Sequence, residues 1–95
     1  SRGGELVTRP ITFRGRRLVV NFATSAAGTM KVELQSATEE PIPGFSLSDA
    51  DETFGNELDR TVSWRGSTDV SRLADRPIRI RVTLKDADLY AVKFS

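Results

Sequence analysis

The 95-residue chain contains no cysteine and no histidine. The absence of cysteine excludes disulfide bonds, thiolate nucleophiles and zinc sites of the zinc-finger type. The absence of histidine excludes an imidazole general base and a Ser-His-Asp triad. Acidic residues could in principle form the carboxylate pair of a glycoside hydrolase, but so short a chain has little material for a cleft that excludes water. We therefore predict a protein without catalytic residues.

The chain also lacks an excess of charge of either sign. It has 14 basic and 13 acidic residues, so no overall field attracts nucleic acid or an anionic membrane. The one basic cluster, residues 14–17, has no interleaved aromatics and indicates a soluble, protected strand edge; contact with phosphate or a sulfated glycan is the alternative. No apolar run approaches the roughly 18–20 residues that cross a bilayer, and the first residues do not resemble a signal peptide. We expect neither nucleic acid nor a membrane as a partner.

Short runs of alternating apolar and polar residues dominate the sequence. Side chains of a strand point to opposite faces in turn, and one buried and one wet face are typical of antiparallel sheets. The alternation predicts that one set of apolar side chains forms a shared core. Its members are Leu18, Val20, Phe22, Met30, Val32, Leu34, Val62, Trp64, Ile78, Ile80, Val82, Leu84, Val92 and Phe94.

Turn-forming residues divide these runs into about seven or eight strands. Residues 25–28 and 85–88 predict hairpin turns, and residues 5–9 and 11–13 predict short strands. Asp69 is a suitable cap for one helical turn near residues 69–75. The predicted fold is all-β, an antiparallel, jelly-roll-like β-sandwich over residues 5–95, with residues 1–4 as a linker or expression remnant.

Five segments in this order resemble a known module: residues 4–11, 18–28, 41–45, 62–66 and 86–90. The run Asn-Phe-Ala-Thr-Ser-Ala-Ala-Gly at residues 21–28 is the most specific. Together they resemble the C-terminal module of planctomycete-type proteins, where it follows a β-propeller similar to glycoside hydrolase family thirty-two or sialidase-like enzymes. The resemblance implies a β-sandwich accessory to a sugar-active catalytic domain, in a parent protein that is secreted or periplasmic. It supplies no binding motif.

The longest loop, residues 46–57, is rich in oxygen donors. Asp49, Asp51, Glu52 and Asn56 lie within it, and two further carboxylates, Asp86 and Asp88, lie in a predicted hairpin turn. Calcium binds such oxygens, so Asp49 and Asp51 are candidate calcium ligands and the whole set is a candidate ligand site. The competing interpretation is that aspartate simply favours turns, because it hydrogen-bonds nearby backbone.

The sequence leaves two functions open. The first is a carbohydrate-binding module that holds a parent enzyme on an oligosaccharide or polysaccharide. Only Trp64 and Tyr90 could stack on a sugar with a polar tip, and both fall on apolar strand faces, which favours core packing. The second is a structural domain that packs against the catalytic domain of the same chain and binds no ligand. A binding module would keep a polar groove, whereas a packing domain would expose a contiguous apolar patch.

Overall fold

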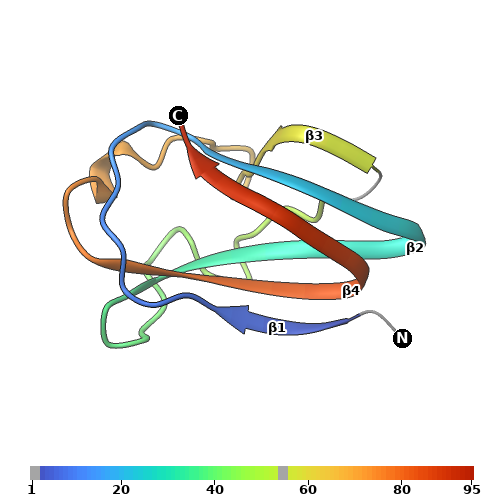
Figure 1. The fold of residues 1–95 in the computed structure, drawn as a ribbon. Helices are drawn as coiled ribbons and strands as arrows, with labels where there is room; N and C mark the ends of the chain where they lie inside the picture. The colour runs from blue at the N-terminus through green and yellow to red at the C-terminus, as the bar shows by residue number, and fades with distance from the viewer. Residues whose placement is uncertain (1–2, 54–55) are drawn as a thin grey trace.

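A computed structural model describes residues 3–53 and 56–95. The strands of this model form one antiparallel sheet (Figure 1). Its strands are β1 (Gly3–Val7), β2 (Leu18–Ser36), β3 (Asn56–Thr61) and β4 (Ile78–Phe94), in the spatial order β1-β4-β2-β3. A 3₁₀ helix, η1 (Ser71–Leu73), lies between β3 and β4 in the sequence. The prediction of an all-β, antiparallel protein is therefore confirmed.

The prediction of hairpin turns at residues 25–28 and 85–88 is wrong. β2 continues through residues 25–28 and β4 through residues 85–88, so two strands stand where four were expected. β2 and β4 pair with each other along their whole length, from Leu18 opposite Phe94 to Ser36 opposite Ile78. Both strands bend at the same end of the molecule and return, which folds the sheet over on itself (Figure 1).

The bend depends on close contact between the backbones of β2 and β4. The pairing is irregular between Thr24 and Thr29, and Asp86 adopts a positive φ of 49° on the opposite strand. A Cβ atom added to Gly28 would lie 2.3 Å from the Asp86 carbonyl oxygen. Only glycine leaves room for this approach, so Gly28 is required for the turn of the sheet rather than for a hairpin.

The shorter predicted elements are shifted in the structure. β3 begins at Asn56, inside the predicted long loop, and ends at Thr61. The rest of the alternating run at residues 61–65 forms no regular strand, although Trp64 makes isolated bridges with Ala50 and Ser67. Of residues 11–13, Ile11 forms an isolated bridge with Ile78. β1 begins at Gly3 and so includes two of the four residues assigned to a linker, while residues 1–2 lie outside the described chain.

The predicted helical turn is confirmed as η1. Asp69 Oδ1 accepts a hydrogen bond of 2.9 Å from the Ser71 backbone N–H just before it. Val70 and Leu73 are buried and attach this turn to the core. The core as a whole also gains Phe13, Ile42 and Phe45 from irregular segments.

Eleven of the fourteen predicted core side chains are buried, and two more pack against the core. The buried ones are Leu18, Val20, Phe22, Met30, Val32, Leu34, Val62, Trp64, Ile78, Ile80 and Val82, while Leu84 and Phe94 are partly buried. Phe94 stacks on Phe13 with ring centroids 3.9 Å apart. The prediction is wrong for Val92, which is 38% exposed.

Tyr90 was also expected in the core, and it is 67% exposed instead. Asn21 pairs with Ala91 and Phe22 pairs with Leu89, which leaves Tyr90 as an extra residue on β4. Such a bulge changes the direction of the side chains that follow it, so the strict alternation between the two faces of the strand is interrupted. Beyond β1, this part of β4 is an edge of the described sheet, and that position explains the exposure of Val92.

The pair Val20–Val92 tests this account of the core, because the two valines lie opposite each other. We expect Val20→Ala to lower the free energy of unfolding by about 2–4 kcal/mol, since it removes buried methyl groups and leaves a cavity. Val92→Ala should cost less than about 1 kcal/mol because its side chain already contacts water. Urea denaturation of both variants measures the difference. Equal losses would contradict the assignment of β4 as an open edge.

Candidate functional site

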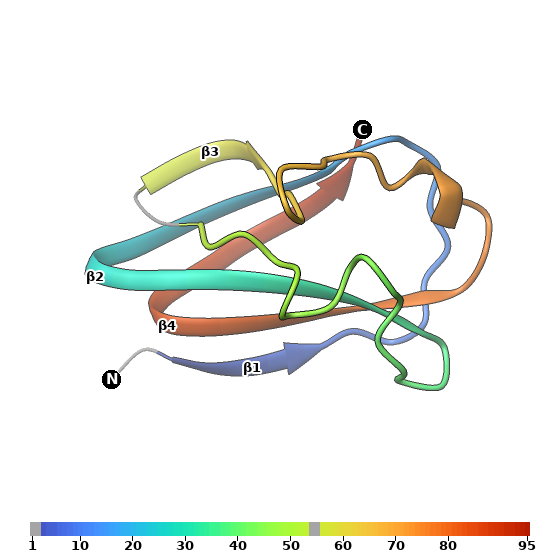
Figure 2. The same cartoon turned by 180° about the vertical axis from the view of Figure 1, so that it is seen from behind.

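The loop that the sequence singled out lies along the edge of β2. Within the loop, Thr53 exchanges two backbone hydrogen bonds of 2.9 Å with Met30; just before the loop, Ile42 N–H donates to the Leu34 carbonyl over 3.0 Å. Seen from behind, this segment runs beside the second half of β2 (Figure 2). Its backbone is thus held by the sheet. Its two large apolar residues suit anchors to the core: Leu47 is half-buried, and Phe54 lies outside the described residues.

Two of the predicted ligands, Asp49 and Asp51, bond to their own chain. Asp49 Oδ1 accepts from Arg65 Nε over 2.7 Å, and this bond is the main cause that lowers the Asp49 pKa. Asp51 Oδ2 accepts from Ser63 Oγ over 2.6 Å and from Gly66 N–H over 2.8 Å, and both bonds lower the Asp51 pKa. These carboxylates fix the turn at residues 64–67.

The other predicted ligands do not join them. Glu52 is exposed on the loop, and Asn56 opens β3 with a side chain that is not described. Asp86 and Asp88 lie in the bend of β4, where Asp88 stands opposite Ala23. Within residues 3–53 and 56–95, no group of three or more acidic side chains could hold a metal ion. Calcium binding at Asp49 and Asp51 therefore remains a prediction without support.

The turn that the two aspartates fix forms one wall of a pocket of about 440 Å³, which the sequence analysis did not identify. The turn at Gly44 lies opposite two segments that are close in the sequence, the turn at residues 64–67 and the start of η1, and together they build it. Its lining residues are Gly44, Phe45, Trp64, Arg65, Ser67, Asp69 and Arg72. Apart from Trp64, none of them belongs to the alternating pattern that predicts the core. The only sequence signal is that both aromatics border a glycine-containing turn.

Two aromatic rings form the floor of this pocket. Phe45 and Trp64 are buried and meet edge to face, with ring centroids 5.1 Å apart and planes at 75°. The Trp64 indole N–H donates to the Val32 carbonyl over 2.8 Å. This confirms the prediction that Trp64 packs in the core with its polar tip bonded, and it gives the pocket a rigid apolar base.

Charged side chains form the rim. The Arg72 guanidinium lies 4.9 Å from the centre of the Phe45 ring and donates to the Pro43 carbonyl over 2.8 Å. Arg65, on the turn at residues 64–67, is held by its ion pair with Asp49. The Asp69 carboxylate accepts hydrogen bonds from Ser71, which lower its pKa and keep it ionised. The pocket thus offers fixed donors and acceptors above an aromatic base.

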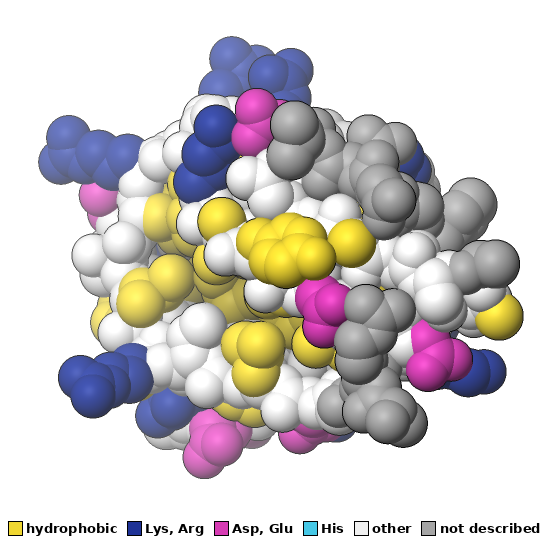
Figure 3. All heavy atoms as spheres, turned by 45° about the vertical axis from the view of Figure 1, so that its right-hand side comes forward, with side chains coloured by type: hydrophobic (Ala, Val, Ile, Leu, Met, Phe, Trp, Pro, Cys, Tyr) yellow, Lys and Arg dark blue, Asp and Glu magenta, His cyan; other side chains and the backbone are white. Residues whose placement is uncertain are grey.

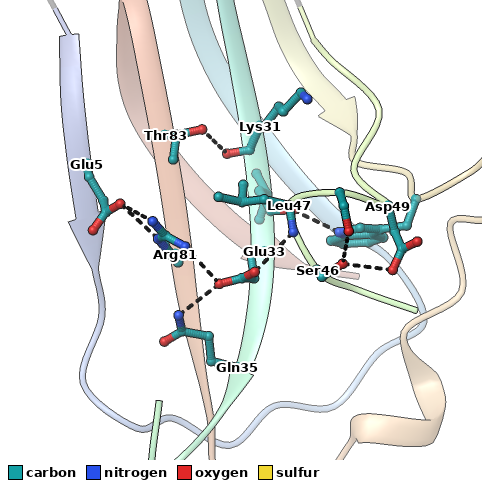
Figure 4. Close-up of polar contacts among 12 residues, drawn as sticks. Glu5, Lys31, Glu33, Gln35, Ser46, Leu47, Asp49, Arg81 and Thr83 are labelled. Carbon is teal, nitrogen blue, oxygen red and sulfur yellow. Dashed lines mark hydrogen bonds and ion pairs between the residues drawn. The ribbon is translucent and has the colours of Figure 1, made fainter. Parts of the chain in front are cut away.

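A second polar network lies on the outer face of the sheet (Figure 4). Arg81 on β4 joins Glu5 of β1 to Glu33 of β2, with Nε–Oε2 and Nη1–Oε2 distances of 2.9 and 3.2 Å. Glu33 is buried and also accepts from Gln35 Nε2 and from the Leu47 backbone N–H. Burial alone would raise the Glu33 pKa, but these hydrogen bonds and Arg81 lower it below the ordinary value. The network pairs charges across three strands, with its central carboxylate, Glu33, buried rather than exposed to water.

A scan of family models, a search of curated proteins and a search of solved structures each found no match to this chain. The described residues contain no helix long and apolar enough to cross a membrane. The resemblance to the accessory module of propeller proteins stays a prediction.

The internal bonds of Asp51 predict a role in holding the pocket wall. Asp51→Ala removes the partner of Ser63 Oγ and Gly66 N–H, so it should lower the free energy of unfolding by about 1–3 kcal/mol. Glu52→Ala, at the adjacent exposed position, should change it by less than about 0.5 kcal/mol. Because Asp49 and Asp51 already bond to the chain, added calcium should leave the melting temperature of the wild-type protein unchanged. A rise of the melting temperature with calcium that Asp51→Ala abolishes would instead support a calcium site at these residues.

The lowered Glu33 pKa predicts acid sensitivity. A carboxylate whose pKa is lower in the folded than in the unfolded chain stabilises the fold above its ordinary pKa of 4.5, and that stabilisation is lost as the pH falls below this value. Denaturation at pH 7 and at pH 3 should therefore show a smaller loss of stability for Glu33→Gln than for wild type. Glu40→Gln, an exposed control, should keep the wild-type loss. A Glu33→Gln protein with the wild-type pH dependence would contradict the assignment.

Proposed function

We propose that this chain is a non-catalytic accessory module of a larger sugar-active protein and that it binds carbohydrate in the pocket lined by Phe45, Trp64 and Arg72. The observation that carries the proposal is a pocket of about 440 Å³ with aromatic rings at its base and charged groups at its rim. Binding pockets commonly combine apolar walls with a few fixed polar groups that set orientation.

Carbohydrates match this combination chemically. A sugar ring presents an apolar C–H face, which packs against an aromatic edge, and a ring of hydroxyls, which both donate and accept hydrogen bonds. Arg65 and Arg72 supply donors, the Asp69 carboxylate supplies acceptors, and the Ser67 hydroxyl supplies both. The rim groups are held by bonds to Asp49, Pro43 and Ser71, so little conformational entropy is lost on binding.

The fold and the resemblance support the same proposal. We interpret the folded-over sheet as a sandwich-like, jelly-roll-like accessory domain, because the bend brings two layers of β2 and β4 around one core. The segments that resemble the propeller-associated module include Gly28 and the turn of Trp64, which form the bend and the pocket wall. In this proposal the catalytic domain of the parent chain performs the reaction, and the pocket binds the carbohydrate polymer on which that domain acts.

A structural packing domain is the second candidate, and one observation favours it. Leu6, Val7 and Val92 are each 38% exposed and Tyr90 is 67% exposed, on β1 and the open part of β4. Hydrophobic side chains also gather at the centre of the face in Figure 3, around a hollow. Exposed apolar groups of this size suit a contact with another domain of the same chain.

A glycan array with the isolated protein tests the proposal, followed by affinity measurements on any glycan retained. Ser67→Tyr places a bulky ring in the pocket, and we expect it to weaken binding at least about tenfold. Ser25→Tyr adds the same ring at an exposed position in the bend and should bind as wild type. Both variants should keep the wild-type melting temperature.

Two results would overturn carbohydrate binding at this pocket: retention of no glycan by a folded protein, or equal affinities of the two tyrosine variants. The first of these results would leave the packing domain as the better account of the chain.

A further inference from the structure

We propose that the pocket selects saccharides that carry an anionic group, a carboxylate or a sulfate ester, and that Arg72 is the residue that binds this group. This inference deepens the proposed carbohydrate binding and rests on it. It arises from the distribution of charge partners around the pocket rather than from its shape.

Arg72 is the one charged group of the lining for which the described residues supply no opposite charge. Ion pairs are formed by Arg14, Arg65, Arg81 and Lys93, and Arg72 takes part in none of them. Arg72 contacts a carbonyl oxygen and an aromatic face instead. Both contacts orient the guanidinium, yet neither neutralises it.

The other charged groups of the lining are already compensated. Arg65 Nε lies 2.7 Å from Asp49 Oδ1, so an anion brought to Arg65 would compete with an existing carboxylate. Asp69 accepts hydrogen bonds from Ser71, and the nearby Arg16 adds a smaller favourable interaction that also lowers the Asp69 pKa. The remaining uncompensated charge of the pocket is therefore the cation of Arg72.

The chemistry of guanidinium favours a planar or multi-oxygen anion. Its N–H groups form a rigid fork that matches two oxygens of a carboxylate or sulfate, and such charge-assisted bonds are roughly twice as strong as neutral ones. A neutral sugar offers only hydroxyl oxygens to the same fork. Asp69 and Ser67 remain as partners for the hydroxyls of an acidic sugar, and their presence distinguishes this pocket from a site for a bare anion.

Matched pairs of polymers separate charge from sugar structure. Affinity electrophoresis would compare polygalacturonate with its fully methyl-esterified form, and dextran sulfate with dextran. We expect the protein to bind at least one charged polymer at least about tenfold more tightly than its neutral partner. Binding of polygalacturonate alone would assign a carboxylate, and binding of dextran sulfate alone would assign a sulfate ester.

Arginine variants test the residue. Arg72→Gln should reduce binding to the charged polymer about tenfold or more, and Arg72→Lys should recover only part of it because lysine lacks the planar fork. Arg76→Gln removes the same charge at an exposed position outside the lining, and it should bind as wild type. Melting curves identify any loss that arises from weaker packing on Phe45.

The outcomes separate this inference from the proposed function. Equal binding of charged and neutral polymers, blocked by Ser67→Tyr, would overturn anion selection and leave carbohydrate binding intact. Equal effects of Arg72→Gln and Arg76→Gln would show attraction by net charge and would overturn the role of Arg72. Failure to bind any polymer or any glycan of the array would overturn both proposals.

Discussion

The pairing of β2 with β4 is the interaction on which the rest of the structure depends. It extends on both sides of the bend in the sheet, and this bend requires backbone contact between Gly28 and Asp86. β1 adds to one half of β4 and β3 to one half of β2, so neither short strand has a partner without the long pair. The core side chains of β2, on both sides of the bend, face inward for the same reason.

The pocket is a product of that same scaffold. The edge of β2 holds the segment from Ile42 to Thr53, this segment carries Asp49 and Asp51, and the two aspartates hold the turn that bears Arg65. Carboxylates that resemble metal ligands in the sequence thus orient a cation and a backbone turn. In the proposed function, their contribution is to shape the pocket wall.

The sequence predicted the strand content and most of the core because alternation depends on local burial. It could not distinguish a bend from a hairpin at residues 25–28, since small residues and glycine suit both, and only the position of Asp86 decides between them. Tyr90 was misplaced because one inserted residue shifts the alternation without any change in composition. The pocket escaped prediction because Phe45, Trp64 and Arg72 come from separate segments whose proximity only the tertiary fold creates.

The wide separation of paired strands has a consequence for how the chain acquires its structure. The contact of Arg81 with Glu5 joins residues 76 positions apart, and the longest pairing of β2 is with β4, which comes last in the sequence. Chains dominated by such non-local pairings fold slowly, in milliseconds to seconds, because loop closure precedes any gain from contacts. During synthesis β2 is made before β4, so its apolar face stays uncovered until β4 follows. The polar residues that alternate along β2 therefore also protect the nascent chain against aggregation.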